Sequence, residues 1–131
     1  MIVLKDEGLY CPEGDFFIDP LLPCKNAVIT HAHADHARPG MKNYICTPET
    51  SEIMKLRISN DLLIKEVEYN NEIQINSVKI TFIPAGHVLG SSQIKIDNGS
   101  EVTIITGDYK RDSDPTCKAF EVHDCDSFMA E

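Results

Sequence analysis

Short apolar runs, several of them alternating with polar residues, recur along the chain and predict many strands. Residues 27–30 form a small continuous apolar run that suits a buried strand, and residues 44–46 form another. Residues 72–75 and 78–83 alternate with a period of two, which directs their apolar side chains to one face of a sheet. The run at 15–18 lies between a glycine turn and a proline, and this punctuation indicates one more short strand.

Turn and cap residues indicate a hairpin and a helix. Asn98-Gly99 separates two alternating runs, 93–96 and 101–105, and this dipeptide is the strongest short signal for a β-hairpin. Thr47 followed by Pro48 has the residue types of a helix N-cap and first turn. Strands mixed with at least one helix predict a layered α/β (α+β) fold.

The chain has the organisation of one domain. Hydrophobic residues account for 42% of the sequence and charged residues for 25%, which is typical of a globular fold. Because there is no repeat, low-complexity tract or linker, we interpret residues 1–131 as a single domain. Residues 126–131 have the pattern of a strand that begins and then stops. We therefore expect this domain to be truncated from a longer protein.

Composition and charge exclude several classes of protein. No apolar run approaches the roughly 18–20 residues of a membrane span, and the N-terminus lacks the layout of a secretory signal. Twelve Lys and Arg against 21 Asp and Glu give a net charge of −9, whereas nucleic-acid-binding proteins are usually basic. Charge alone therefore favours a neutral or cationic partner, or a site that gathers metal ions.

The cysteines indicate a reducing compartment. Their number is odd and no two of them form a C-x-x-C pair, which is a poor pattern for a disulfide framework or a zinc ribbon. Without an export signal, we interpret them as free thiols in a cytoplasm. They are Cys11, Cys24, Cys46, Cys117 and Cys125.

The central chemical feature is the segment 30–36, Thr-His-Ala-His-Ala-Asp-His, directly after an apolar run. In extended backbone His31 and His33 point to the same side, and a turn into helix would direct Asp35 and His36 to a second point nearby. A lone histidine is more often a surface or core residue than a ligand. Three imidazoles within six positions favour metal binding instead, because a core would have to desolvate each of them.

Two later residues extend this candidate site. His87 and Asp108 each follow a predicted strand and each stand next to a glycine. Alone, His87 could be a surface histidine and Asp108 could cap a turn. Together with the 31–36 cluster they suggest one shared mouth of a sheet. Residues 110–112 and His123 are expected to be solvated surface.

These motifs carry a family resemblance. His31-x-His33-x-Asp35-His36, followed by His87 and Asp108, resembles the metallo-β-lactamase superfamily of two-metal hydrolases. Segments 85–91 and 106–110 resemble its nucleic-acid-processing branch, called β-CASP. The chain is most similar to the bacterial ligase-associated DNA exonuclease group, also labelled mRNA 3′-end-processing-factor-like. Further shared stretches are 8–12, 14–16, 18–20, 27–39, 114–117, 120–121 and 125–126.

The resemblance implies a fold and a set of ligands. The fold would be the N-terminal half of a metallo-β-lactamase αββα sandwich, a strand-rich mixed sheet with at least one flanking helix. The family's metal ligands map onto six residues, of which Asp35, His36 and Asp108 are also the catalytic ones. His31, His33 and His87 would bind one metal, Asp35 and His36 the second, and Asp108 both. Asp19 matches the aspartate that orients the ligands from behind, and Glu131 falls where an acidic motif begins.

The family's nucleases continue beyond the point that corresponds to residue 131. The resemblance places the inserted β-CASP domain there, together with the second half of the lactamase fold. That part of the family supplies one more histidine ligand and the histidine that acts as general acid. The resemblance therefore leaves open whether residues 1–131 catalyse a reaction by themselves.

The resemblance also implies a function. We expect a cytoplasmic, metal-dependent phosphodiesterase or exonuclease of DNA repair or processing, with two divalent ions, zinc before manganese. The expected substrate is nucleic acid, DNA before RNA, and the expected partner is a DNA ligase or helicase system, with no membrane. One alternative is a hydrolase of the same fold that acts on RNA or on a small ester or thioester. The other is a non-catalytic metal-binding fragment that self-associates through an exposed apolar face.

Overall fold

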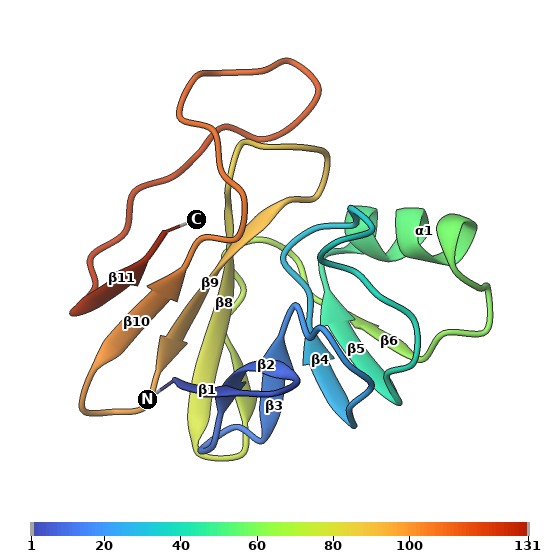
Figure 1. The fold of residues 1–131 in the computed structure, drawn as a ribbon. Coiled ribbons are helices and arrows are strands. Elements are labelled where there is room, and N and C mark those ends of the chain that lie inside the picture. The colour runs from blue at the N-terminus through green and yellow to red at the C-terminus, as the bar shows by residue number, and fades with distance from the viewer. Residues whose placement is uncertain (1, 131) are drawn as a thin grey trace.

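The computed structural model describes residues 2–130, so the expectation for Glu131 lies outside the described part. Two sheets form the body of the protein, and a single described helix, α1 (Pro48–Arg57), accompanies them (Figure 1). The first sheet has the spatial order β1 (Val3–Lys5), β2 (Gly8–Cys11), β3 (Phe16–Ile18), β4 (Asn26–Val28), β5 (Asn43–Cys46) and β6 (Ile64–Glu66). The second has the order β11 (Ser127–Met129), β10 (Val102–Ile105), β9 (Ser92–Asp97), β8 (Val78–Pro84) and β7 (Ile73–Ile75).

Strand direction differs along the two sheets. Strands β1 to β3 pair antiparallel, whereas β3 to β6 pair parallel, and α1 makes the crossover from β5 to β6. Strands β7 to β10 form an antiparallel meander, and β11 joins β10 in parallel. The predicted α/β (α+β) class is confirmed. The Thr47 side chain accepts a hydrogen bond from the Thr50 amide, as predicted for an N-cap.

Two apolar clusters hold these layers together. The larger one joins the inner faces of the two sheets, with buried members such as Phe16, Val28, Phe82 and Ile94. The smaller one lies on the first sheet and includes Met54 of α1, which covers the β4–β6 end of that sheet (Figure 1). Strands β1 and β6 have three residues each, all half-buried or exposed, and β2 has four residues without a period-two burial pattern, which is why apolar periodicity did not locate them.

Two other expectations concern the cysteines and membranes. All five cysteines are free, and Cys11 and Cys46 are buried as small apolar residues. Among residues 2–130, no helix combines the length and apolar character that a bilayer crossing requires.

Candidate metal centre

Loops from both sheets meet at one edge of the protein. Strands β8 and β10 both pair antiparallel with β9, so they run in the same direction and end at the same edge. The amide of Ser92, at the start of β9, donates to the Thr30 carbonyl at 2.8 Å and ties the β4 loop of the other sheet to this edge. Each of three strands is followed, three positions after its last residue, by a candidate ligand. These ligands are His31 after β4, His87 after β8 and Asp108 after β10.

The histidine-rich loop after β4 forms a turn rather than the helix considered from the sequence. The Ala37 amide donates to the His33 carbonyl at 2.8 Å, and no α-helix follows within residues 31–42. Arg57, in the last turn of α1, fastens this loop from outside. Its Nε donates to the Ala32 carbonyl at 3.1 Å, and its Nη2 donates to the Ala37 carbonyl. The loop is therefore held at both ends of its turn.

The loop that carries His87 is anchored by hydroxyl groups. The Ser91 Oγ accepts hydrogen bonds from the His87 amide at 3.1 Å and from the Val88 amide at 3.2 Å. The Thr47 and Thr50 hydroxyls donate to the Gly90 carbonyl at 2.8 and 3.0 Å. A Cβ at Gly90 would lie 2.7 Å from the Thr50 amide nitrogen, so this close approach requires glycine. The N-terminus of α1 thus holds the loop in place.

Four of the six predicted ligands converge on one point. His31, His33, His87 and Asp108 each offer a ligand atom, and these atoms all lie within 4.8 Å of one another. The Nδ1 of His33 lies 3.3 Å from the Nε2 of His87. The Nε2 of His31 is buried without a hydrogen-bond partner and lies 3.7 Å from a carboxylate oxygen of Asp108. A buried orphan acceptor is costly unless it meets a donor or a cation, so this arrangement fits a metal ion.

The remaining two predicted ligands lie beside this group. The Nε2 of His36 is 3.5 Å from one oxygen of Asp108 and 3.6 Å from one oxygen of Asp35. The Asp35 side chain is 72% exposed, whereas that of His36 is 8% exposed. All six predicted residues are therefore brought to one edge, with Asp108 between the two sets. Their roles as ligands stay a prediction.

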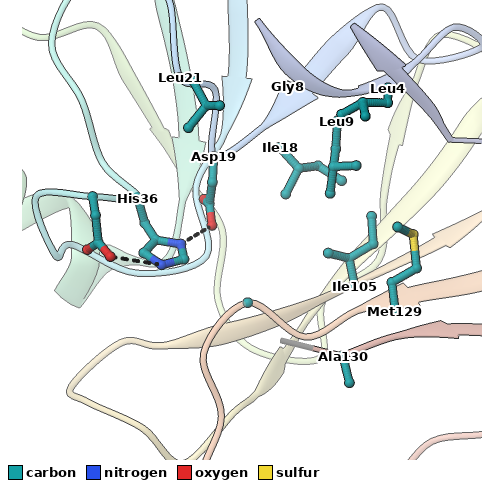
Figure 2. A pocket seen from close by; sticks show the side chains of 12 residues that line it. Leu4, Gly8, Leu9, Ile18, Asp19, Leu21, His36, Ile105, Met129 and Ala130 are labelled. Atoms are coloured by element: carbon teal, nitrogen blue, oxygen red, sulfur yellow. Dashed lines mark hydrogen bonds and ion pairs between the residues drawn. The ribbon is translucent and has the colours of Figure 1, made fainter. Parts of the chain in front are cut away.

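Asp19 and Thr30 support the histidines from behind. Asp19 follows β3, and its Oδ2 accepts a hydrogen bond from the His36 Nδ1 at 2.8 Å (Figure 2). The same oxygen accepts from the Thr30 hydroxyl at 2.5 Å. Since the Thr30 hydroxyl donates to Asp19, its lone pair accepts from the His31 Nδ1 at 3.0 Å. Both rings then carry Nδ1–H and direct Nε2 towards Asp108. One carboxylate thus orients two candidate ligands, as is usual behind ligating histidines.

The electrostatics of the site follow from this arrangement. Burial, together with the neighbouring imidazoles, lowers the pKa of His31 to about 3, so this ring is neutral at pH 7 and retains a ligand lone pair. The hydrogen bond with Asp19 raises the pKa of His36 to about 9. Burial raises the pKa of Asp19, although its hydrogen bonds with His36 and Thr30 oppose the rise. A metal that binds the Nε2 of His36 must therefore displace a proton.

A cleft of about 290 Å³ opens beside the Asp19–His36 pair. Figure 2 shows aliphatic side chains from both sheets around it, including Leu9, Ile18, Ile105 and Met129. The cleft lies between β1 and β2 of one sheet and β10 and β11 of the other. The site therefore has polar ligands on one side and an apolar wall on the other.

The donor set defines the metals that fit. Imidazole nitrogens with one or two carboxylates suit zinc, manganese and iron, so the donor set by itself does not choose among these three metals. Sequence reasoning did not assign roles to the supporting residues Thr30, Thr50 and Arg57. The position of Thr30 directly before His31 was the only available signal, since the other two contact the site across 20 residues or more of sequence.

Sequence comparison finds nuclease and ligase relatives. No protein-family model matches the chain. It is 29% identical over 105 residues to a probable DNA ligase of Opitutus terrae, which covers 79% of this chain and 10% of the relative. It is 36% identical over 59 residues to the endoribonuclease YSH1 of Saccharomyces cerevisiae, covering 45% of this chain and 8% of the relative. The chain therefore spans a tenth or less of the length of these curated relatives.

Comparison with solved structures shows the fold. The diiron β-hydroxylase CmlA of Streptomyces venezuelae superimposes with a TM-score of 0.64 at 15% identity, over 86% of this chain and 30% of CmlA. The flavodiiron protein of Giardia intestinalis superimposes with a TM-score of 0.58 at 17% identity, over 72% of this chain and 30% of that one. The chain therefore has the metallo-β-lactamase fold of these proteins.

Proposed function

We propose that the chain provides the metal centre of a phosphodiesterase that trims nucleic-acid ends, DNA in preference to RNA. The observation that carries this proposal is the buried, unpartnered Nε2 of His31, which converges with His33, His87 and Asp108. In this proposal one metal binds the three histidines, Asp35 and His36 bind a second, and Asp108 bridges them. The nuclease and ligase relatives support nucleic acid as the substrate.

The residues of the site have separable tasks. Two divalent ions held together lower the pKa of a water molecule and neutralise charge on phosphate oxygens. Asp108 is half-buried, its carboxylate oxygens lie 3.7 Å from His31, 3.5 Å from His36 and 3.6 Å from His87, and it would be the ligand that the two ions share. Asp19 and Thr30 keep the His31 and His36 rings in one orientation, so that binding requires little reorganisation. The exposed Asp35 faces the solvent side, from which a polymer would approach.

The test combines metal analysis with cleavage. We expect about two zinc or manganese atoms per chain by elemental mass spectrometry, fewer in Asp108→Asn, and no change in the matched surface variant Asp61→Asn. End-labelled DNA and RNA of one sequence, incubated with zinc or manganese and with EDTA, then measure cleavage and its substrate preference. If neither the chain nor a longer protein that contains it cleaves either polymer in a metal-dependent way, the proposal is wrong.

Two outcomes would select the alternatives. Faster cleavage of RNA than of DNA would favour an RNA-processing nuclease, for which the YSH1 endoribonucleases are the supporting relatives. Metal bound without cleavage of either polymer, or of a small ester or thioester, would favour a non-catalytic metal-binding fragment. The non-catalytic alternative also predicts self-association through the exposed apolar face of the half-sandwich, and a clean monomer by light scattering would argue against it.

We further propose cytoplasmic function beside a DNA ligase or helicase, and the ligase relative supports the ligase partner.

A further inference from the structure

A second pocket lies beside the candidate metal centre and has a different chemistry. It has a volume of about 240 Å³ and lies on the segment between β10 and β11. Two rings form part of its wall: those of Tyr109 and Phe120 lie 5.4 Å apart at 38°. Both side chains are half-buried, whereas Val122 and Phe128 at the same pocket are 87% and 51% exposed. The pocket therefore presents aromatic and aliphatic surface to solvent.

The backbone places this pocket next to the metal ligands. Tyr109 directly follows Asp108, and the Lys110 amide donates to the Ala85 carbonyl at 3.0 Å. A Cβ at Gly86 would lie 2.4 Å from the Lys110 carbonyl and 2.9 Å from the Phe120 amide nitrogen. Gly86, which precedes His87, therefore lets the segment with the two rings contact the His87 loop. The aromatic pocket and the metal centre share these two loops.

Buried hydrogen bonds keep the wall of the pocket rigid. The Gln93 side chain is 1% exposed, and its Nε2 donates to the Pro84 carbonyl at 3.0 Å and to the Glu121 carbonyl at 2.8 Å. The Glu121 amide also donates to the Pro84 carbonyl at 3.2 Å. These bonds connect the segment to the end of β8. The rings are thus positioned before any ligand arrives.

The charged groups near the pocket do not attract a polyanion, and they favour a planar, polar ligand instead. Arg111 is exposed and, within residues 2–130, forms no ion pair. The Nε2 of His123 lies 3.3 Å from a carboxylate oxygen of Glu121. Residues 109–126 contain three basic and five acidic side chains, so attraction to phosphate supplies little affinity here. Stacking on aromatic rings, with an arginine at the edge, is the alternative source.

We propose that this aromatic pocket binds a single unpaired nucleobase of the substrate, next to the bond that the metal centre cleaves. This inference rests on the proposed function for the position of the cleaved bond. A volume of 240 Å³ lies below the roughly 300–1,000 Å³ of pockets for drug-sized ligands, which suits one ring system. Stacking tolerates every base because each has a π-face, so the pocket selects a frayed or single-stranded end over a paired one.

The test uses mononucleotides and keeps metal out of the measurement. In EDTA, dTMP is titrated against the chain with aromatic resonances observed by NMR, and 2-deoxyribose 5-phosphate serves as the ligand without a base. We expect the Tyr109 and Phe120 ring resonances to shift with dTMP and not with the sugar phosphate. In Tyr109→Leu the Kd for dTMP should rise about tenfold, whereas Tyr109→Phe retains the ring and should bind as the parent does.

A matched variant and a second ring keep the outcome decisive. Tyr10→Leu removes a half-buried aromatic ring of β2 that packs on Phe17 of β3. Both residues lie in the first sheet, away from the pocket, so the Kd for dTMP should not change. Should Tyr109→Leu fail to fold by urea denaturation, Phe120→Leu replaces it with the same expectation. The inference is overturned if 2-deoxyribose 5-phosphate binds as tightly as dTMP, or if Tyr10→Leu weakens dTMP binding as much as Tyr109→Leu does. It is also overturned if a hydrophobic dye bound to the chain is not displaced by dTMP. If Tyr109→Leu cleaves nucleic acid as fast as the parent in the presence of metal, the pocket inference is wrong and the proposed function stands. If the chain binds dTMP but cleaves no nucleic acid, the proposed function is wrong and base binding stands.

Discussion

Replacing Thr30 by valine isolates the hydrogen-bond relay behind the candidate ligands. Valine has nearly the shape of threonine, so the change removes one buried hydroxyl and little volume. That hydroxyl donates to Asp19 at 2.5 Å and accepts from His31 at 3.0 Å, and Thr30 and His31 are both fully buried. The variant leaves the Nδ1–H of His31 without its acceptor, whereas Asp19 keeps its hydrogen bonds with the Thr30 amide and His36.

The magnitude follows from these contacts. A buried donor left unsatisfied costs about 1–3 kcal/mol, and we expect the free energy of unfolding to fall by that amount. The freed His31 ring can also rotate or change its tautomer. Loss of a partner behind a ligating histidine typically lowers metal affinity 10- to 100-fold, which corresponds to about 1.4–2.7 kcal/mol. Both effects are therefore large enough to measure.

Two assays separate the effects. Urea denaturation measures the loss of stability, and zinc titration against a competing chelator measures the loss of affinity. Thr30→Ser restores the hydroxyl and should recover most of the affinity. Thr103→Val changes a buried threonine of β10 outside the relay and should leave zinc binding unchanged. A zinc affinity within twofold of the parent in Thr30→Val would refute the relay, whatever happens to stability.

Three further predictions test two supports of the site and the burial of the Cys46 thiol. Arg57→Met removes two hydrogen bonds to the histidine-rich loop and should weaken zinc binding several-fold in the same titration, with α1 retained by circular dichroism. Gly107→Ala places a Cβ 2.7 Å from the Thr30 hydroxyl at a φ of +56°, and should cost about 2–4 kcal/mol in urea denaturation. Gly99→Ala, with φ +89° and open space, should cost only about 1–2 kcal/mol, and equal costs would contradict the packing argument. Burial raises the pKa of Cys46 to about 12, so at pH 8 it should react with Ellman's reagent only after unfolding.

Local patterns in the sequence accounted for much of the fold. The alternating run of β8, the Asn98-Gly99 turn between β9 and β10, and the Thr47 cap of α1 all lie where these patterns predicted. Such signals depend on neighbours a few residues away, which is why a single sequence carries them. Strand β6 escaped prediction because it is short and its side chains are half-buried or exposed.

The candidate ligands were recognisable from the sequence because they are dense and chemically specific. The His31–His36 segment predicts metal binding by itself. His87 and Asp108 joined it because each follows a predicted strand and stands next to a glycine, and the family resemblance then assigned their roles. Which of these side chains meet was decided by tertiary structure. The parallel directions of β8 and β10 bring His87 and Asp108 to one edge, and the Ser92–Thr30 hydrogen bond brings the β4 loop to them.

Apart from Asp19, which the family resemblance had named, the supporting contacts were accessible only from the folded protein. The only sequence signal for Thr30 is its position directly before His31, yet its hydroxyl connects Asp19 to His31 and thereby orients the His31 ring. Arg57 lies 20 and 25 residues from the carbonyls it binds, and no periodicity relates them. A sequence specifies donors and acceptors, whereas hydrogen-bond pairing requires distances and angles that only the packing of strands, loops and helix can set.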